Sequence, residues 1–171
     1  MPNAFHVNGP AVIWCADQGL AGALVQLGIS EDGVGITLQQ HDEPIMTDDA
    51  GTRIPHDLQD MGEDALIDFR LVYYDLDVLR RIRRRRMLPG AGINQPARGV
   101  PIFTALGGFR LAIQSDTDEP WRFFFCTTRG AQRARVGTRR TAWDMSVYAI
   151  PGYTDPNNKK AGRQLYDHVF K

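Results

Sequence analysis

The chain has 171 residues, which is long enough for one domain with a sizeable buried core and requires no disulfide or metal to fold. Hydrophobic residues make up 43% and charged residues 23%, a balance that excludes a disordered, collagenous or fibrous chain. No apolar run approaches the roughly 18 residues that a membrane span needs, and residues 1–9 lack the pattern of a secretion signal. We therefore expect a soluble protein without membrane partners.

Formal charges separate along the chain, although they sum to zero. Residues 1–78 carry 14 acidic and 2 basic side chains, whereas residues 79–171 carry 6 acidic and 18 basic ones. Neutralisation inside one domain accounts for part of this polarity, but complementary faces of identical copies need the same separation. The pattern favours self-association, because one pair of complementary patches can build rings or filaments.

Several segments of the first half predict strands. Residues 10–17 form a short apolar run, and residues 34–40 alternate strictly between apolar and polar, entered through a turn at Asp32 and Gly33. Residues 65–73 alternate as well, which predicts a half-buried strand. Its expected buried positions are Ala65, Ile67, Phe69, Leu71 and Tyr73.

The segment 41–62, between those two strands, has no periodicity. It contains six acidic residues and two prolines. We predict a long loop, and loops of this length inside a compact domain usually carry a function.

One helix is predicted over residues 75–87, with Asp75 as the N-cap and Pro89 and Gly90 ending it. A loop rich in glycine and proline follows over residues 88–101. Strand patterns then return at residues 109–114, 121–128, 132–136 and 141–150, and the first two are expected to pair as a hairpin.

The sequence thus predicts a mainly β fold, an antiparallel β-sandwich or partial barrel with one flanking α-helix and a long loop. We place this domain at residues 1–151 and a C-terminal tail at residues 152–171. Apolar residues of the tail are expected to form a docking turn of helix, namely Leu165, Tyr166, Val169 and Phe170.

Signals for catalysis, cofactors and metals are missing from the sequence. It contains no phosphate-binding glycine loop, no dinucleotide fingerprint, no HExxH and no GxSxG. Cys15 and Cys126 form no CxxC pair and are interpreted as buried apolar residues. The loop acids do not follow a calcium-binding pattern. The four histidines are too scattered to predict a metal site: His6, His41, His56 and His168.

Six arginines crowd the end of the predicted helix: Arg80, Arg81, Arg83, Arg84, Arg85 and Arg86. Such a run could neutralise nucleic-acid phosphates. However, no aromatic residues are interleaved with it and the whole chain is neutral, so we favour a basic surface that faces a partner protein.

Three stretches share an order of elements with a known family. They are residues 27–38, with a glycine-rich entry into a strand; residues 47–63, an acidic loop with Ile54 and Pro55; and residues 141–151, a closing strand. A strand and a helix start follow the loop at residues 65–79. Together they resemble phage tail tube proteins, whose subunits form stacked hexameric rings inside the tail.

The resemblance implies a virion structural protein, assembled in the host cytoplasm, without catalysis or cofactors. Its implied partners are further copies of the chain and other tail proteins such as sheath, neck or baseplate, while DNA passes through the lumen unbound. A contact loop between rings would contain Ile45, Met46, Asp48, Asp49, Ile54, Asp57, Leu58 and Met61. Candidates for the lumen wall are Gly35, Thr37, Gln39, Asp68 and Arg70, with Arg70 expected to pair with an acid such as Asp68 of a neighbouring subunit.

Other functions stay open at this point. The arginine run, the insertion at residues 88–101 and the long tail depart from the family and suggest a specialised collar or baseplate ring. A nucleic-acid-binding module using the arginine helix is a second alternative. A small β-barrel enzyme with an unrecognised acid pair is a third, although no nucleophile, base or cofactor signal supports it.

Overall fold

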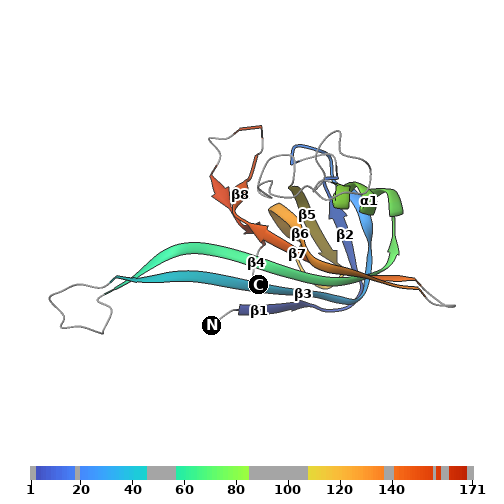
Figure 1. Ribbon diagram of the computed structural model, residues 1–171, viewed down its shortest axis with the longest axis horizontal. Helices are drawn as coiled ribbons and strands as arrows, with labels where there is room; N and C mark the ends of the chain where they lie inside the picture. The colour runs from blue at the N-terminus through green and yellow to red at the C-terminus, as the bar shows by residue number, and fades with distance from the viewer. Residues whose placement is uncertain are drawn as a thin grey trace.

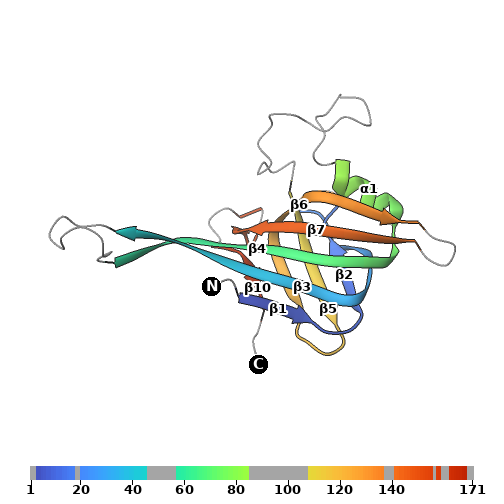
Figure 2. The same cartoon turned by 60° about the horizontal axis from the view of Figure 1, so that its bottom comes forward.

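A computed structural model describes residues 3–17, 20–45, 57–84, 108–136, 141–155, 157–158 and 162–168. Six strands close into an antiparallel β-barrel in the order β3-β2-β5-β6-β7-β4, and β4 pairs back onto β3 (Figures 1 and 2). The predicted mainly β class is therefore confirmed, with the barrel complete rather than partial. The principal strands are β1 (Asn3–Val7), β2 (Ala11–Cys15), β3 (Val25–Ile45), β4 (Asp57–Tyr74), β5 (Phe109–Ser115), β6 (Trp121–Arg135) and β7 (Ala142–Ile150).

Alternating apolar residues fill the barrel, as the sequence predicts. Val34, Ile36 and Leu38 of β3 point inward with Ile67 of β4 and Val147 of β7, and all five side chains are buried. Cys15 and Cys126 are buried and form no disulfide, which confirms their interpretation as core residues. Burial raises the pKa of the Cys126 thiol.

β3 is one long strand that bends at a bulge where the sequence predicts a turn. The register shifts between Ser30 and Val34, and the Ser30 hydroxyl donates to the carbonyl of Gly33. Gly33 has φ +85°, and a Cβ at this residue would lie 2.1 Å from the carbonyl oxygen of Val7. The predicted turn is wrong because β1 and β2 pair with β3 on either side of the bulge, so the strand continues through it.

β3 and β4 continue past the barrel as a two-stranded projection (Figure 1). Residues 41–45 and 57–62 are paired strand, so the prediction of a loop is wrong for these residues; residues 46–56 lie outside the described part of the chain. The sequence of these residues does not alternate between apolar and polar side chains, because neither face of the hairpin is buried. Their pairing depends on backbone hydrogen bonds alone, which leave no pattern in the sequence.

The helix α1 (Leu76–Arg84) packs over one end of the barrel. Asp75 is its N-cap, as predicted, because its carboxylate accepts from the backbone N–H groups of Asp77 and Val78 at 2.8 and 3.0 Å. Val78, Leu79 and Ile82 are buried against the core. Tyr73, just before the helix, is 64% exposed, so its predicted burial is wrong. The register between β3 and β4 shifts between Leu71 and Tyr73, and this shift interrupts the alternation that predicted a buried side chain.

Of the predicted turn of helix, the described residues Leu165 and Tyr166 are not helical, and Val169 and Phe170 lie outside the described part of the chain. β8 (Gly152–Tyr153) pairs with β9 (Arg163–Gln164), and β10 (Tyr166–Asp167) pairs with the beginning of β6. Leu165 is buried, and Tyr166 packs against Trp121, with ring centroids 5.2 Å apart. Residues 166–167 pair with the free edge of β6 instead of forming a helical turn. This pairing satisfies backbone N–H and C=O groups that a single helical turn would leave without partners.

Candidate functional site: the arm and the polar face of the barrel

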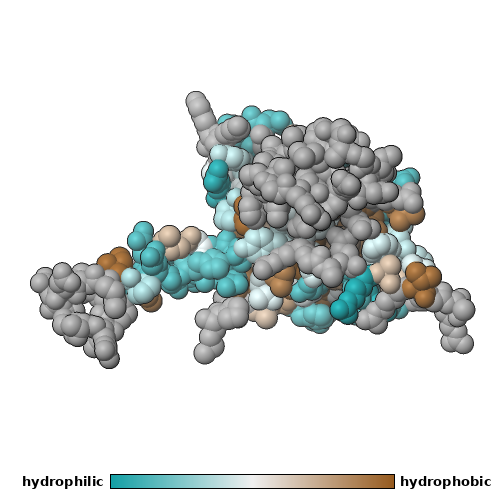
Figure 3. Space-filling view, in the orientation of Figure 1, coloured by the Kyte–Doolittle hydropathy of each residue, from teal (hydrophilic) through white to brown (hydrophobic). Residues whose placement is uncertain are grey.

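The projecting hairpin, residues 39–45 of β3 and 57–63 of β4, is called the arm. Residues 39–45 and 57–61 are all exposed, since no other described strand lies beside them: the pairing of β4 with β7 starts at Ala65. Its surface is mainly hydrophilic with apolar side chains on its outer part (Figure 3). Leu58 is 60% exposed, and Ile45 and Met61 are exposed as well.

A hydrogen-bonded cluster ties the base of the arm to the barrel. The buried carboxylate of Asp64 lies 2.7 Å from Nε2 of His41 and also accepts a hydrogen bond from the Tyr148 hydroxyl on β7. The register shifts between His41 and Asp42, and the opposing Gly62 has φ +107°. The cluster and the bulge together set the direction in which the arm leaves the barrel.

Acidic side chains lie close to one another at the base of the arm. Burial and the neighbouring carboxylates of Asp60 and Asp64 raise the pKa of Glu63. The acidic character of the arm therefore carries a cost within the isolated chain, which a basic partner would reduce.

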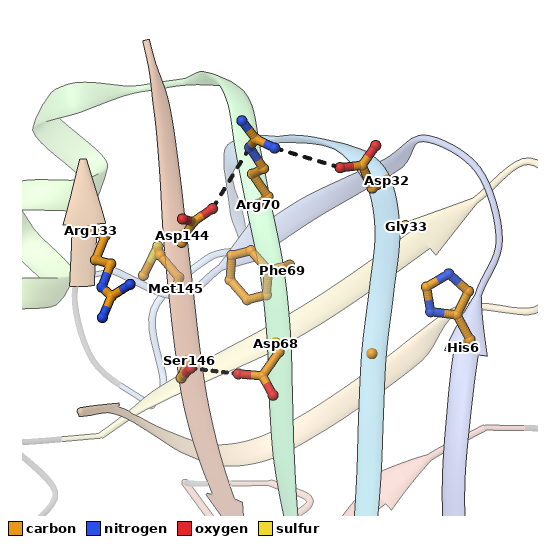
Figure 4. Close-up of a pocket in the computed structure, with 11 residues that line it drawn as sticks. His6, Asp32, Gly33, Asp68, Phe69, Arg70, Arg133, Asp144, Met145 and Ser146 are labelled. Carbon is orange, nitrogen blue, oxygen red and sulfur yellow. Dashed lines mark hydrogen bonds and ion pairs between the residues drawn. The ribbon is translucent and has the colours of Figure 1, made fainter. Parts of the chain in front are cut away.

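On the outer face of the barrel, a shallow hollow of about 380 Å³ crosses β1, β3, β4, β7 and β6 (Figure 4). Its polar lining forms two cross-strand rows. One contains His6, Gly35, Asp68 and Ser146, and the other contains Asp32, Arg70, Asp144 and Arg133. We call this surface the polar face.

Several charged residues of the polar face interact with one another within the chain. Arg70 lies between Asp144 and Asp32, with nitrogen–oxygen distances of 3.7 and 3.9 Å, which are ion-pair rather than hydrogen-bond distances (Figure 4). Asp68 accepts a hydrogen bond from Ser146. A surface with its cations and anions balanced in this way has little net attraction for phosphate.

The structure brings together most of the predicted lumen residues. Gly35, Asp68 and Arg70 line the polar face, while Thr37 and Gln39 follow Gly35 on the same side of β3 because strand side chains alternate. The expected pairing of Arg70 with Asp68 of a neighbouring subunit stays a prediction, but Asp32 and Asp144 of its own chain already face its guanidinium.

The predicted contact loop is only partly described. Ile45, Asp57, Leu58 and Met61 lie on the arm and are exposed. The other members lie outside the described residues: Met46, Asp48, Asp49 and Ile54.

Of the predicted basic surface, Arg81 has a described side chain, and it is engaged inside the chain. Arg81 donates to the carboxylate of Asp17, which is 4% exposed and lies just after β2, so this arginine anchors α1 to the barrel. Arg80, Arg83 and Arg84 belong to the helix, although their side chains are outside the described part. Arg85 and Arg86 also lie outside it.

Sequence reasoning missed the Asp64 cluster and the place of His6 in the polar face. Both depend on which strands become neighbours and in which register, and the residues are separated by up to 84 positions in the case of Tyr148 and Asp64. The alternation of Asp144, Ser146 and Tyr148 did place these side chains on one face of β7, which was the one available signal.

Among the residues that the structure describes, no group of three histidine, cysteine or acidic side chains is arranged to hold a metal ion. No helix in the described ranges is long and apolar enough to cross a membrane. Comparison with models of known protein families finds no matching family, and comparison with curated protein sequences finds no matching protein.

Proposed function

We propose that this chain is a structural subunit, without catalytic activity, of stacked hexameric rings that form a phage tail tube. The observation that carries the proposal is the arm: an exposed, acidic hairpin with apolar side chains, projecting from a barrel that is complete without it. A two-stranded hairpin with exposed side chains gains little stability from burial, so contact with a second molecule would stabilise the arm.

The barrel supports the same proposal. A closed sheet leaves few free strand edges, and free edges promote aggregation by pairing with other chains. A subunit packed among many copies of itself benefits from their absence, because it then associates only through specific surfaces. The polar face is hydrophilic, and Arg70 is paired with acidic side chains. The wall of a DNA channel needs such a surface, because unpaired cations would bind the phosphates and hold the genome back.

A specialised ring on the same fold, at the neck, collar or baseplate, differs from a tube subunit only in its position in the particle. Sheath, neck or baseplate proteins are the corresponding partners, and the proposed location is the virion tail. Both versions need ring formation, which is therefore the property to test first.

The test compares the full chain with a variant in which residues 42–61 are replaced by Asn-Gly. His41 and Gly62 are direct partners in the register, so a two-residue turn can join them without disturbing the barrel. Sedimentation velocity and negative-stain images are recorded for both proteins over a range of concentrations. We expect rings and stacked tubes from the full chain, and unstacked rings or monomers that keep a β-rich circular dichroism spectrum from the variant.

Only monomers of 19.2 kDa at every concentration would contradict ring formation. A DNA affinity of the purified full chain that falls steeply with salt would favour the nucleic-acid-binding alternative instead.

A further inference from the structure

Two hairpins leave the barrel at opposite ends of the long axis. The arm projects at one end, and β6 and β7 extend beyond their neighbours at the other (Figures 1 and 2). The outer part of this second projection, residues 129–136 and 141–144, is called the basic hairpin. The two projections are too far apart to meet within one copy, because the whole barrel lies between them.

The two hairpins have opposite charge. The described strands of the arm, residues 39–45 and 57–63, carry five acidic residues and no arginine or lysine, whereas the basic hairpin, residues 129–136 and 141–144, carries three arginines and one acidic residue, Asp144. Asp42 and Glu43 are exposed on the arm, and Arg133 is exposed on the basic hairpin. Part of the charge separation seen along the sequence is thus a separation between two ends of one molecule.

Each hairpin also exposes apolar side chains. Val136 is 83% exposed at the end of β6, and Leu58 is 60% exposed on the arm, where Ile45 and Met61 add to the apolar surface. Burying such side chains contributes roughly 25 cal/mol per Å² of apolar surface, so a contact between the hairpins would gain from both charge and burial.

We infer that the arm of one copy binds the basic hairpin of the next copy. Contacts between two arms, or between two basic hairpins, would place like charges together, which disfavours an end-to-end two-fold arrangement. Because each copy has one hairpin of each kind at opposite ends, the contact repeats along an axis. The inference rests on the proposed function and deepens it, since it names the surface that receives the arm.

Charge reversal with complementation tests this contact. The arm variant is Asp42→Lys with Glu43→Lys, and the basic-hairpin variant is Arg133→Glu with Arg135→Glu. The matched control is Asp116→Lys with Asp118→Lys, which makes the same charge change at exposed positions of the turn between β5 and β6. Circular dichroism melting verifies that each variant folds, and Arg133→Ser is the milder substitute where the double variant does not.

We expect each reversed variant alone to lose end-to-end association by at least about tenfold in the sedimentation assay, since like charges now face each other. The control should associate as the wild type does. An equimolar mixture of the two variants should recover association, because the reversed arm of one then meets the reversed hairpin of the other.

Other results separate the inference from the proposed function. Wild-type rings that stack, together with variants that stack equally well, would overturn the inference and leave the proposed function standing. Loss of DNA binding without any loss of stacking in the basic-hairpin variant would overturn it too, by assigning the hairpin to nucleic acid. A wild type that associates without forming rings would contradict the proposed function itself, and failure of the mixture of variants to associate would then contradict the inference.

Discussion

The same two strands, β3 and β4, have different surroundings in the barrel and in the arm. Within the barrel, each has a further neighbour, and every second side chain, such as Ile36 and Ile67, is buried. Within the arm, each strand has only the other, and the side chains around Leu58 face solvent. Backbone pairing is alike in both regions, so the difference between them is burial, and we expect burial to make the barrel the more stable region in the single copy.

The largest difference is expected from truncating an apolar side chain in each region. Ile67→Ala removes a fully buried side chain and should lower the free energy of unfolding by about 2–5 kcal/mol. Leu58→Ala, the matched change on the arm, should alter the stability of the single copy by at most about 0.5 kcal/mol. Urea unfolding followed by circular dichroism measures both, and equal losses would mean that the arm is packed in the free protein.

Glycine substitutions make a second comparison. Gly33→Ala meets a positive φ and a carbonyl oxygen 2.1 Å from the new Cβ, and should cost about 2–4 kcal/mol. Gly62→Ala meets a positive φ but no atom within 4 Å, and should cost about 1–2 kcal/mol. Thermal melting ranks the two, and the reverse order would show that the bulge beside β1 adapts more easily than the base of the arm.

The junction between the two regions depends on Asp64. Asp64→Ala leaves the Tyr148 hydroxyl and His41 without their shared acceptor and should cost about 1–3 kcal/mol. Asp64→Asn keeps an acceptor oxygen and should recover part of the loss. Asp68→Ala is the control, because that carboxylate is exposed and its loss should cost less. If Asp68→Ala lowered the free energy of unfolding as much as Asp64→Ala does, the buried cluster would contribute no more to stability than an exposed hydrogen bond.

The smallest effect concerns pH. The pKa of Glu63 is raised above its ordinary value of 4.5, mainly by burial, so the folded state holds this proton more tightly than the unfolded state. Stability from this group is present below pH 4.5 and is lost as the pH rises through the raised pKa. Glu63→Gln should therefore be slightly more stable than wild type at pH 7, with the difference shrinking below pH 4.5. A difference that is independent of pH in urea unfolding would contradict the assignment.

The sequence predicts the barrel better than it predicts the arm, for the same physical reason. A buried face imposes alternation, so residues 34–38 and 65–71 reveal themselves as strands. Residues 41–45 have no buried face, and their pattern carries no trace of the strand that they form. Asp75 was predictable as an N-cap because capping is a local interaction.

The site was predictable only where strand alternation sufficed. Gly35, Thr37 and Gln39 lie on one side of β3 whichever strands flank it, so their shared face follows from spacing alone. The partners of Arg70 and of Asp64 depend on the register of β3, β4 and β7, which is set by the closure of the whole barrel. Long-range register is not encoded in any single segment.

Hydrogen exchange of the arm tests the central claim, that the arm is weakly stable in the single copy and is stabilised by binding a second molecule. Backbone amides of residues 39–45 and 57–63 are compared with those of residues 34–38 and 65–71 in the single copy and in the assembled state, with mass spectrometry as the readout. We expect fast exchange in the arm of the single copy despite its pairing, slow exchange in the barrel, and at least about tenfold slower exchange in the arm after assembly. An arm already as protected as the barrel in the single copy, or one whose exchange is unchanged by assembly, would contradict the claim.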